Sequence, residues 1–451
     1  MPAKKAHQGG KGKKQAHDDD DDFDALLAAA VQQNHAAALK VPKRGGGGGG
    51  ARALPPRNMA ADEPVQPSSE SHPENPYPAA LPDCPRQTWP EPTVTIRRQF
   101  PSGHFPLGEI LEHPGPLNTF RLNSAEKRER EKAGEAEIED LRLAGEVHRQ
   151  VRRWAQSWIR PGLPLMLLAD RIEKKLGELI EKDGLHRGQA FPTGCSLNNV
   201  AAHYTPNTGD EKVVLGYDDV VKVDFGTQVN GRIVDSAWTA CFNPVYEPLL
   251  QAVREATYEG VRQAGIDVRL GDIGAAIEEV MESHEVEING TVYPVKSIRN
   301  LSGHNIAPYI IHSGKSVPIV KGGEQTKMEE GELFAIETFG STGRGYVTED
   351  LECSHYMMVP GAEVMQMRSD KAQRLLRHIH KTYGTLAFCR KWLDRDGFDR
   401  HLLNLNQLVE QGAVNKYPPL CDVKGCYTAQ LEHTILLKPT AKEIISKGDD
   451  Y

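Results

Sequence analysis

Five residues have types and settings that could support metal chemistry. Four are carboxylic acids inside apolar, strand-like stretches, and one is a histidine that follows a glycine: Asp224, Asp235, His304, Glu337 and Glu432. Carboxylates on one buried face repel each other and are costly to desolvate unless cations lie between them. Oxygen-rich ligation with a single imidazole suits two ions of Mn(II), Fe(II), Co(II) or Zn(II), which can activate water and polarise a carbonyl. Taken singly, each acid could instead be an ordinary partner of a nearby arginine or lysine.

The first element that must position these residues is a hairpin. Apolar and polar residues alternate over residues 221–225, the period of a half-buried strand. Asn230-Gly231 then favours a type I′ turn, because both central residues of that turn need a positive φ. This turn pairs Asp224 with Ala237 and makes Asp224 and Asp235 diagonal neighbours, about 7–8 Å apart. The alternative is a surface hairpin with solvated aspartates, which the apolar flanks disfavour.

A similar plan returns later in the chain. An acid again precedes a Phe-Gly pair in the strand predicted at 332–340, and another acid lies in the strand predicted at 427–437. Amphipathic spacing predicts a helix over 124–158 and another through Ile172 to Ile180 before the hairpin. It also predicts a helix after the hairpin that ends at Gly265, and a next one capped by Asp272. We therefore expect an α/β fold with an internal duplication, whose two halves face a shared site.

Two regions depart from this plan. Within residues of about 354–417, apolar residues recur at helical spacing over 372–383 and 388–408, which predicts a helical insertion. Residues 1–95 combine lysines, an aspartate run, a glycine tract and proline-rich sequence, which cannot bury enough apolar surface to order the chain. We expect a disordered arm that either only solvates the protein or docks a charged partner such as the ribosome or a translation factor. The ordered domain is expected to span 96–451.

Composition narrows the setting. The chain has 451 residues and a net charge of −8, so no global basic field favours nucleic acid. No apolar run reaches the roughly 20 residues of a membrane span, and no secretory signal is apparent. Seven scattered cysteines without a CxxC pair indicate reduced thiols in a cytoplasmic protein. No heptad pattern demands an oligomer, so we expect a monomer.

Together these motifs resemble the type 2 methionine aminopeptidases over about residues 95–451. Besides Asp235, the resemblance is carried by Ala202-His203-Tyr204-Thr205-Pro206, Lys222-Val223-Asp224-Phe225-Gly226, Gly303-His304-Asn305, Ile336-Glu337-Thr338-Phe339-Gly340 and Gln430-Leu431-Glu432-His433-Thr434. The insertion between Glu337 and Glu432 separates type 2 from type 1, and the charged arm resembles that of eukaryotic, fungal-like forms.

The resemblance implies a duplicated "pita-bread" fold and removal of initiator methionine from nascent chains with a small second residue. It implies two divalent metal ions that activate a hydroxide. One would be held by Asp224, Asp235 and Glu432 and the other by Asp235, His304, Glu337 and Glu432. Glu337 would also shuttle protons, and His203 and His312 would bind the peptide and the developing oxyanion. The methionine pocket would be walled by Phe191, Ile311, His355 and Tyr417.

The sequence is also compatible with two rival functions. One is a proline-directed metallopeptidase of the same fold, which the insertion and the His203 segment disfavour. The other is a non-catalytic, translation-associated binding protein, which would be expected to have lost metal ligands, whereas all five positions are filled here.

Overall fold

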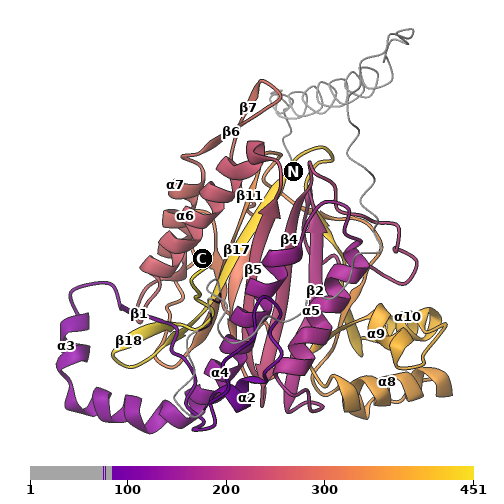
Figure 1. Cartoon of the computed structure of the whole chain (residues 1–451), viewed down its shortest axis with the longest axis horizontal. Helices are drawn as coiled ribbons and strands as arrows, with labels where there is room; N and C mark the ends of the chain where they lie inside the picture. Colours follow the sequence, from indigo (N-terminus) through magenta and orange to yellow (C-terminus); the bar gives the residue numbers. More distant parts are fainter. Residues whose placement is uncertain (1–74, 76, 78–83) are drawn as a thin grey trace, which may run out of the picture. The chain divides into compact units, whose positions relative to one another are not determined.

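The centre of the fold is the hairpin of strands β4 (Val220–Val229) and β5 (Arg232–Cys241). The computed structural model describes residues 75, 77 and 84–451, shown in colour in Figure 1. Asn230 and Gly231 both have positive φ, 48° and 79°, as the predicted turn requires. The predicted register is confirmed, since Asp224 pairs with Ala237. Strand β2 (Arg187–Leu197) pairs with the other edge of β4, which gives the sheet order β2-β4-β5.

A second sheet carries the later acids. Its strands β11 (Leu333–Ser341) and β17 (Thr428–Leu437) pair antiparallel and match the two predicted strands closely. The sheet order is β1-β18-β17-β11-β9-β10, with β8 also paired to β11. The further strands are β1 (Glu109–Glu112), β18 (Ala441–Ile444), β9 (Ser302–Ile306), β10 (Ser316–Pro318) and β8 (Lys296–Ser297). Strand β5 of the first sheet lies against β17 of the second (Figure 1).

Two pairs of helices cover the two sheets. The first pair is α4 (Ala125–Trp158) and α5 (Leu165–Leu179), which contact β4, β5 and β2. Ser124 caps α4 by accepting a hydrogen bond from the Lys127 amide. The second pair is α6 (Glu247–Gln263) and α7 (Leu270–Met281), which contact β11, β17 and β10. Each sheet thus packs its own helix pair, as the expected duplication requires.

The predicted cap of α7 is wrong. The N-cap is Arg269, and Asp272 lies inside the first turn without capping it. The backbone of Arg269 forms a bridge with Lys327, so the chain enters the helix before it reaches Asp272. An acid in the first turn still interacts favourably with the helix dipole.

The insertion carries its own small core. It contains helices α8 (Asp370–Thr382), α9 (Arg390–Arg395) and α10 (Leu402–Glu410) with a sheet of order β14-β13-β15. These strands are β13 (His355–Met358), β14 (Ala387–Cys389) and β15 (Val414–Tyr417), and a 3₁₀ turn, η2, spans Ala362–Val364. The single helix predicted over 388–408 is wrong, because Phe388 lies in β14 and Gly397, at φ 82°, follows the end of α9. The sequence pattern predicted helices in the insertion but not the sheet of β13, β14 and β15.

The remaining elements are short. They are α2 (Ile96–Gln99), α3 (Asn118–Asn123), η1 (Pro244–Tyr246), β3 (Val200–Ala202), β6 (Glu285–Ile288), β7 (Thr291–Pro294), β12 (Thr348–Glu349) and β16 (Leu420–Cys421). Strands β12, β16 and β3 form one sheet, and β6 pairs with β7. No helix in the described part of the chain has the length and apolar character needed to cross a membrane. All seven cysteines are free thiols.

Part of the predicted arm contacts the folded domain. Most of it, residues 1–74, lies outside the described residues. Tyr77 and Gln87, however, are buried against α4, where the Gln87 amide donates to the Gln150 side chain at 2.7 Å. The Tyr77 hydroxyl donates to the Gln150 carbonyl at 3.3 Å. Packed chain therefore begins before the boundary expected at residue 95, because a polar glutamine pair can anchor a segment that hydrophobicity alone does not mark.

Candidate metal centre

The eleven side chains predicted for the site line one cavity of about 440 Å³. They are Phe191, His203, Asp224, Asp235, His304, Ile311, His312, Glu337, His355, Tyr417 and Glu432. Both sheets and the insertion contribute to this set, although the residues are spread over more than two hundred positions of the sequence. The walls also include residues that the sequence reasoning missed, among them Leu301, Lys315, Phe339, Met357 and Ala387.

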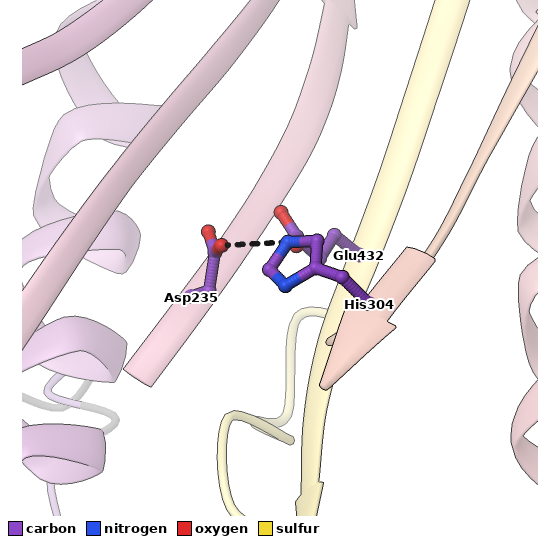
Figure 2. A group of neighbouring side chains, drawn as sticks. All are labelled: Asp235, His304 and Glu432. Carbon is purple, nitrogen blue, oxygen red and sulfur yellow. Dashed lines mark ion pairs between the residues drawn. The ribbon is translucent and has the colours of Figure 1, made fainter. Parts of the chain in front are cut away.

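Three of the proposed ligands converge most tightly. One ligand atom each from Asp235, His304 and Glu432 lies within 4.8 Å of the others, and Figure 2 shows these side chains pointing at one another from β5, β9 and β17. His304 Nε2 is 3.6 Å from Asp235 Oδ2 and 3.5 Å from Glu337 Oε1. These separations are long for hydrogen bonds and fit donor atoms that share a cation.

The strand registers explain the convergence. Glu337 on β11 lies directly opposite Glu432 on β17, and His304 pairs with Ala335, two residues before Glu337. Like charges directly opposite each other destabilise a sheet. Asp224 and Asp235 face the same cavity from β4 and β5. Each sheet therefore presents two acids to the space between them, and a bound cation or protonation would offset their repulsion.

Gln430 completes the set and was missed by the sequence reasoning. Its side-chain Nε2 donates hydrogen bonds to Asp224 Oδ2 and Glu337 Oε2, each at 3.3 Å. One amide thus joins an acid of the first sheet to an acid of the second. The signal was present, because strand alternation placed Gln430 on the same face as Glu432, two residues away.

The electrostatics of these residues are compatible with a bound cation. Burial raises the pKa of Asp224 to about 7, against a smaller opposing effect from the Gln430 hydrogen bond. Burial and then the neighbouring carboxylates raise the pKa of Asp235, Glu337 and Glu432 well above their ordinary range. Burial, followed by the proximity of His312, lowers the pKa of His304 to about 3, so its imidazole is neutral and can act as a ligand.

Buried carboxylate oxygens without hydrogen-bond partners are also compatible with a bound cation. Asp224 Oδ1, Asp235 Oδ1 and both carboxylate oxygens of Glu432 are buried and accept no hydrogen bond from the described residues. Buried polar atoms without partners are rare and costly. Four acids and one neutral imidazole match the donor preference of divalent first-row metals. The residues present therefore fit the metal ions that the sequence predicted.

His203 has unusual backbone geometry. Its φ is 65°, in the left-handed region that L residues seldom adopt, and such strain often marks a functional position. Burial, and then the nearby rings of His355 and His312, lower its pKa to about 3, so the ring is neutral. The His203 ring meets that of Tyr417 edge-on at 6.0 Å. His312 is more exposed, and its ring lies 4.4 Å from that of His304.

The insertion forms one wall of the cavity. His355 and Met357 come from β13, Ala387 from β14 and Tyr417 from β15. His355 Nδ1 is 2.9 Å from the Ser354 hydroxyl and Nε2 is 3.4 Å from the Thr205 hydroxyl. Both nitrogens are thus engaged by the protein, which favours a wall position over a catalytic one.

Phe191 reaches the cavity because of a glycine. A Cβ placed on Gly226 would lie 2.2 Å from the Phe191 ring, so only glycine allows this approach. This gives a physical reason for the Phe-Gly pair that follows Asp224.

Matching helix residues support the metal-ligand strands in the two halves. His148 of α4 donates through Nε2 to the carbonyls of Phe225 and Ser236, the residues that follow Asp224 and Asp235. Thr257 of α6 reaches the Thr338 hydroxyl at 2.8 Å and the Leu431 carbonyl at 3.2 Å, beside Glu337 and Glu432. The duplication therefore extends to the polar contacts behind the site.

Comparisons with known proteins identify the family of this chain. Residues 139–439 match the model of metallopeptidase family M24. Methionine aminopeptidase 2A of Arabidopsis thaliana is 58% identical over 366 residues, covering 81% of this chain and 82% of that protein. Methionine aminopeptidase 2 of Dictyostelium discoideum is 57% identical over 360 residues, covering 80% and 82%. A solved thermophilic Arx1 shares the fold with a TM-score of 0.59 and 15% identity, covering 70% of this chain and 91% of that one.

The chain therefore belongs to metallopeptidase family M24. Within that family it belongs with the type 2 methionine aminopeptidases, given the identity and coverage of its relatives. The predicted resemblance, the pita-bread fold and the assignment to the metallo-exopeptidases are confirmed. Neither rival function is favoured by these relatives.

Proposed function

We propose that this protein removes the initiator methionine from nascent polypeptides whose second residue is small. The observation that carries the proposal is the convergence of four acids and one histidine from two sheets on a cavity that also holds an apolar wall. Nascent chains in the cytoplasm are the substrates we propose, and the seven free thiols suit a reducing compartment.

The metal ligands in this proposal are Asp224, Asp235, His304, Glu337 and Glu432, which would hold two divalent ions of Co, Mn, Fe or Zn. When bound, such ions act as Lewis acids on the scissile carbonyl and make water a stronger nucleophile. Asp235 and Glu432 lie at the middle of the set, where each faces ligands from both sheets. We propose these two as the shared ligands.

The neighbouring side chains would handle protons and orient the peptide. Glu337 lines the cavity beside His304, and we propose that its carboxylate takes a proton from the attacking water and delivers it to the leaving amine. A neutral imidazole offers one donor and one acceptor. His203 lines the cavity with a neutral ring, and we propose that one of its nitrogens bonds the substrate amide. His312, beside His304, is placed to donate to the developing oxyanion.

Specificity would come from the walls. Phe191, Ile311, His355 and Tyr417 enclose the side that we propose for the methionine side chain. An apolar slot discriminates by only about 1–3 kcal/mol per methylene-sized change. The bond to be cut must lie beside the carboxylates, so a bulky second residue would meet the rim of the cavity.

The test is methionine release from Met-Ala-Ser by purified protein. We expect release that is lost on chelation, restored by Mn(II) or Co(II), and reduced at least about 100-fold in Glu337→Ala. Met-Leu-Ser should be a much poorer substrate, and Ala-Pro-Ser should not be cut. Release of alanine from Ala-Pro-Ser would support the proline-directed alternative, and no hydrolysis with any metal would contradict the enzyme.

A role for the arm in ribosome docking is a separate proposal. It rests on the charged sequence before residue 75 alone. Its test is given below, at the scale of the whole molecule.

A further inference from the structure

The boundary between β5 and β17 has unusual hydrogen bonding. The two strands belong to different sheets, and no backbone–backbone hydrogen bond joins them within residues 84–451. The contact is nevertheless central, because Asp235 lies on β5 and Glu432 on β17. Something other than a β-ladder must therefore fix the spacing of these two acids.

Three hydroxyl groups make this connection, and we call Ser236, Thr239 and Thr434 the seam hydroxyls. Thr434 Oγ1 accepts from the Asp235 amide at 2.8 Å and donates to the Asp235 carbonyl at 2.6 Å. Thr239 Oγ1 makes the same pair of bonds with the backbone of Gln430, both at 2.8 Å. Ser236 Oγ donates to the Glu432 carbonyl at 2.7 Å.

The two threonines occupy equivalent positions. Asp235 faces Thr434 and Thr239 faces Gln430, and these pairs are four residues apart on each strand, so they keep one antiparallel register. In a ladder, residues at such positions would exchange both backbone hydrogen bonds directly, with strands about 4.8 Å apart. Here a side-chain hydroxyl stands between the two backbones. The strands are therefore linked but kept farther apart than in a sheet.

Each seam hydroxyl fixes a residue of the proposed metal centre. Thr434 fixes the backbone of Asp235, and Ser236 fixes that of Glu432. Thr239 fixes the backbone of Gln430, whose amide holds Asp224 and Glu337. The Tyr451 hydroxyl lies 3.3 Å from Ser236 Oγ and supports it from behind. All four acids are thus connected to this boundary.

We propose that the seam hydroxyls are positioning residues that set the distance between the two halves of the metal centre. This inference rests on the proposed metal ligands. Its physical basis is that removing a hydroxyl leaves buried backbone groups unpaired exactly where two acids must stay in place, and the strands can then shift. Loss of a group that orients a metal ligand typically costs about 10- to 100-fold in metal affinity.

The test compares Thr434→Val with Thr428→Val. Thr428 lies on the same face of β17, is equally buried, and donates its hydroxyl to the Asn198 carbonyl, away from the acids. Both variants lose a buried hydroxyl, so both should unfold at a lower temperature without metal. Only Thr434→Val should bind Mn(II) about 10- to 100-fold more weakly by calorimetry on metal-free protein. Thr434→Ser should recover most of the affinity.

The outcomes separate the two proposals. Equal Mn(II) affinity in wild type and Thr434→Val would overturn the positioning role while leaving the metal centre intact. If Thr434→Val does not fold, Ser236→Ala and the double variant Ser236→Ala/Thr239→Val serve in its place, and wild-type Mn(II) affinity in both would equally overturn the positioning role. Failure of wild type to bind Mn(II) would instead contradict the proposed ligands. With saturating Mn(II), Thr434→Val should lower kcat more than it raises KM, because the peptide-binding walls are untouched.

Discussion

The side-chain amide of Gln430 gives the clearest prediction at the scale of single residues. This amide donates a hydrogen bond to one acid of each sheet. Gln430→Ala should therefore leave Asp224 and Glu337 free to move apart. We expect kcat/KM for Met-Ala-Ser to fall about 10- to 100-fold and Mn(II) affinity to fall in parallel. Steady-state kinetics and calorimetry would measure both. Wild-type values for this variant would show that the acids hold their places without it.

The carboxyl group of Asp224 predicts a pH effect in metal-free protein. Its pKa is raised from 3.8 to about 7, chiefly by burial, so the folded state favours the protonated form. The stability that this proton gives is complete below pH 3.8 and is lost as the pH rises through about 7. Between these limits, the free energy of unfolding of wild type should fall relative to that of Asp224→Asn, by at most about 1.4 kcal/mol per pH unit.

Denaturant unfolding of chelated protein at pH 5 and pH 8 would measure this effect. The control is Asp272→Asn, which changes an exposed aspartate in the first turn of α7. The free energy of unfolding of Asp272→Asn should change between pH 5 and pH 8 by the same amount as that of wild type. If the free energy of unfolding of Asp224→Asn changed with pH as that of wild type does, the raised pKa of Asp224 would be contradicted, because its carboxyl group would then take up no proton on folding.

At the scale of elements, the insertion depends on Glu173 of α5. This side chain is 3% exposed and accepts from Lys391 Nζ at 3.1 Å, Trp392 Nε1 at 2.9 Å and Arg395 Nη1 at 3.0 Å. Glu173→Gln should lower the free energy of unfolding by about 1–3 kcal/mol, because buried donors lose a charged partner. It should also raise KM, because β13 to β15 carry a wall of the cavity.

The matched control for Glu173 lies on the same helix. Glu178 is half exposed and pairs with the buried Lys175, which keeps Glu91 as a second partner, so Glu178→Gln should change stability by less than about 1 kcal/mol and leave KM unchanged. Mn(II) affinity should be unaffected in both variants. A loss of metal affinity in Glu173→Gln would show that the insertion supports the metal centre as well as the wall.

The element scale also shows how far the sequence can predict this fold. The β4–β5 register was predictable because alternation and the Asn-Gly turn are local signals. Gly397 splits the helix expected over 388–408, since a stripe of apolar residues does not reveal where a chain reverses. The contacts of the seam hydroxyls could not be predicted from the sequence, because Thr434 and Asp235 are 199 positions apart and a side chain makes the contact.

The same limits apply to the candidate site. The four acids and the histidine stood out because a charged group in an apolar strand needs a partner. That all eleven predicted residues line one cavity was visible only in three dimensions. Gln430 was overlooked because an amide in a strand has many ordinary roles, and its two acid partners lie 206 and 93 positions away. The positive φ of His203 was not predictable, because no turn motif such as Asn-Gly marks this position.

At the scale of the whole molecule, we expect two N-terminal truncations to behave differently, because one ends before the packed part of the chain and the other ends within it. Removing residues 1–74 keeps every contact among the described residues, so we expect kcat/KM and the unfolding temperature to stay at wild-type values. Removing residues 1–95 deletes Tyr77 and Gln87, which leaves buried groups around Gln150 without partners. That truncation should unfold several degrees lower.

Cosedimentation with ribosomes would test the arm on the first of these truncations. Lost association with unchanged hydrolysis would support a docking role for residues before 75. Unchanged association would contradict that role and leave the enzyme proposal as it is. Lower hydrolysis after removal of residues 1–74 would show that the arm acts on the catalytic domain.

The central claim is that Asp224, Asp235, His304, Glu337 and Glu432 hold the metal ions at which methionine is released. Anomalous diffraction from crystals grown with Mn(II) tests it most directly, using protein from a preparation that hydrolyses Met-Ala-Ser. The account predicts manganese peaks between β4–β5 and β11–β17, with all five side chains in coordination distance. An active preparation whose manganese lies elsewhere, or that leaves these side chains without metal, would contradict it.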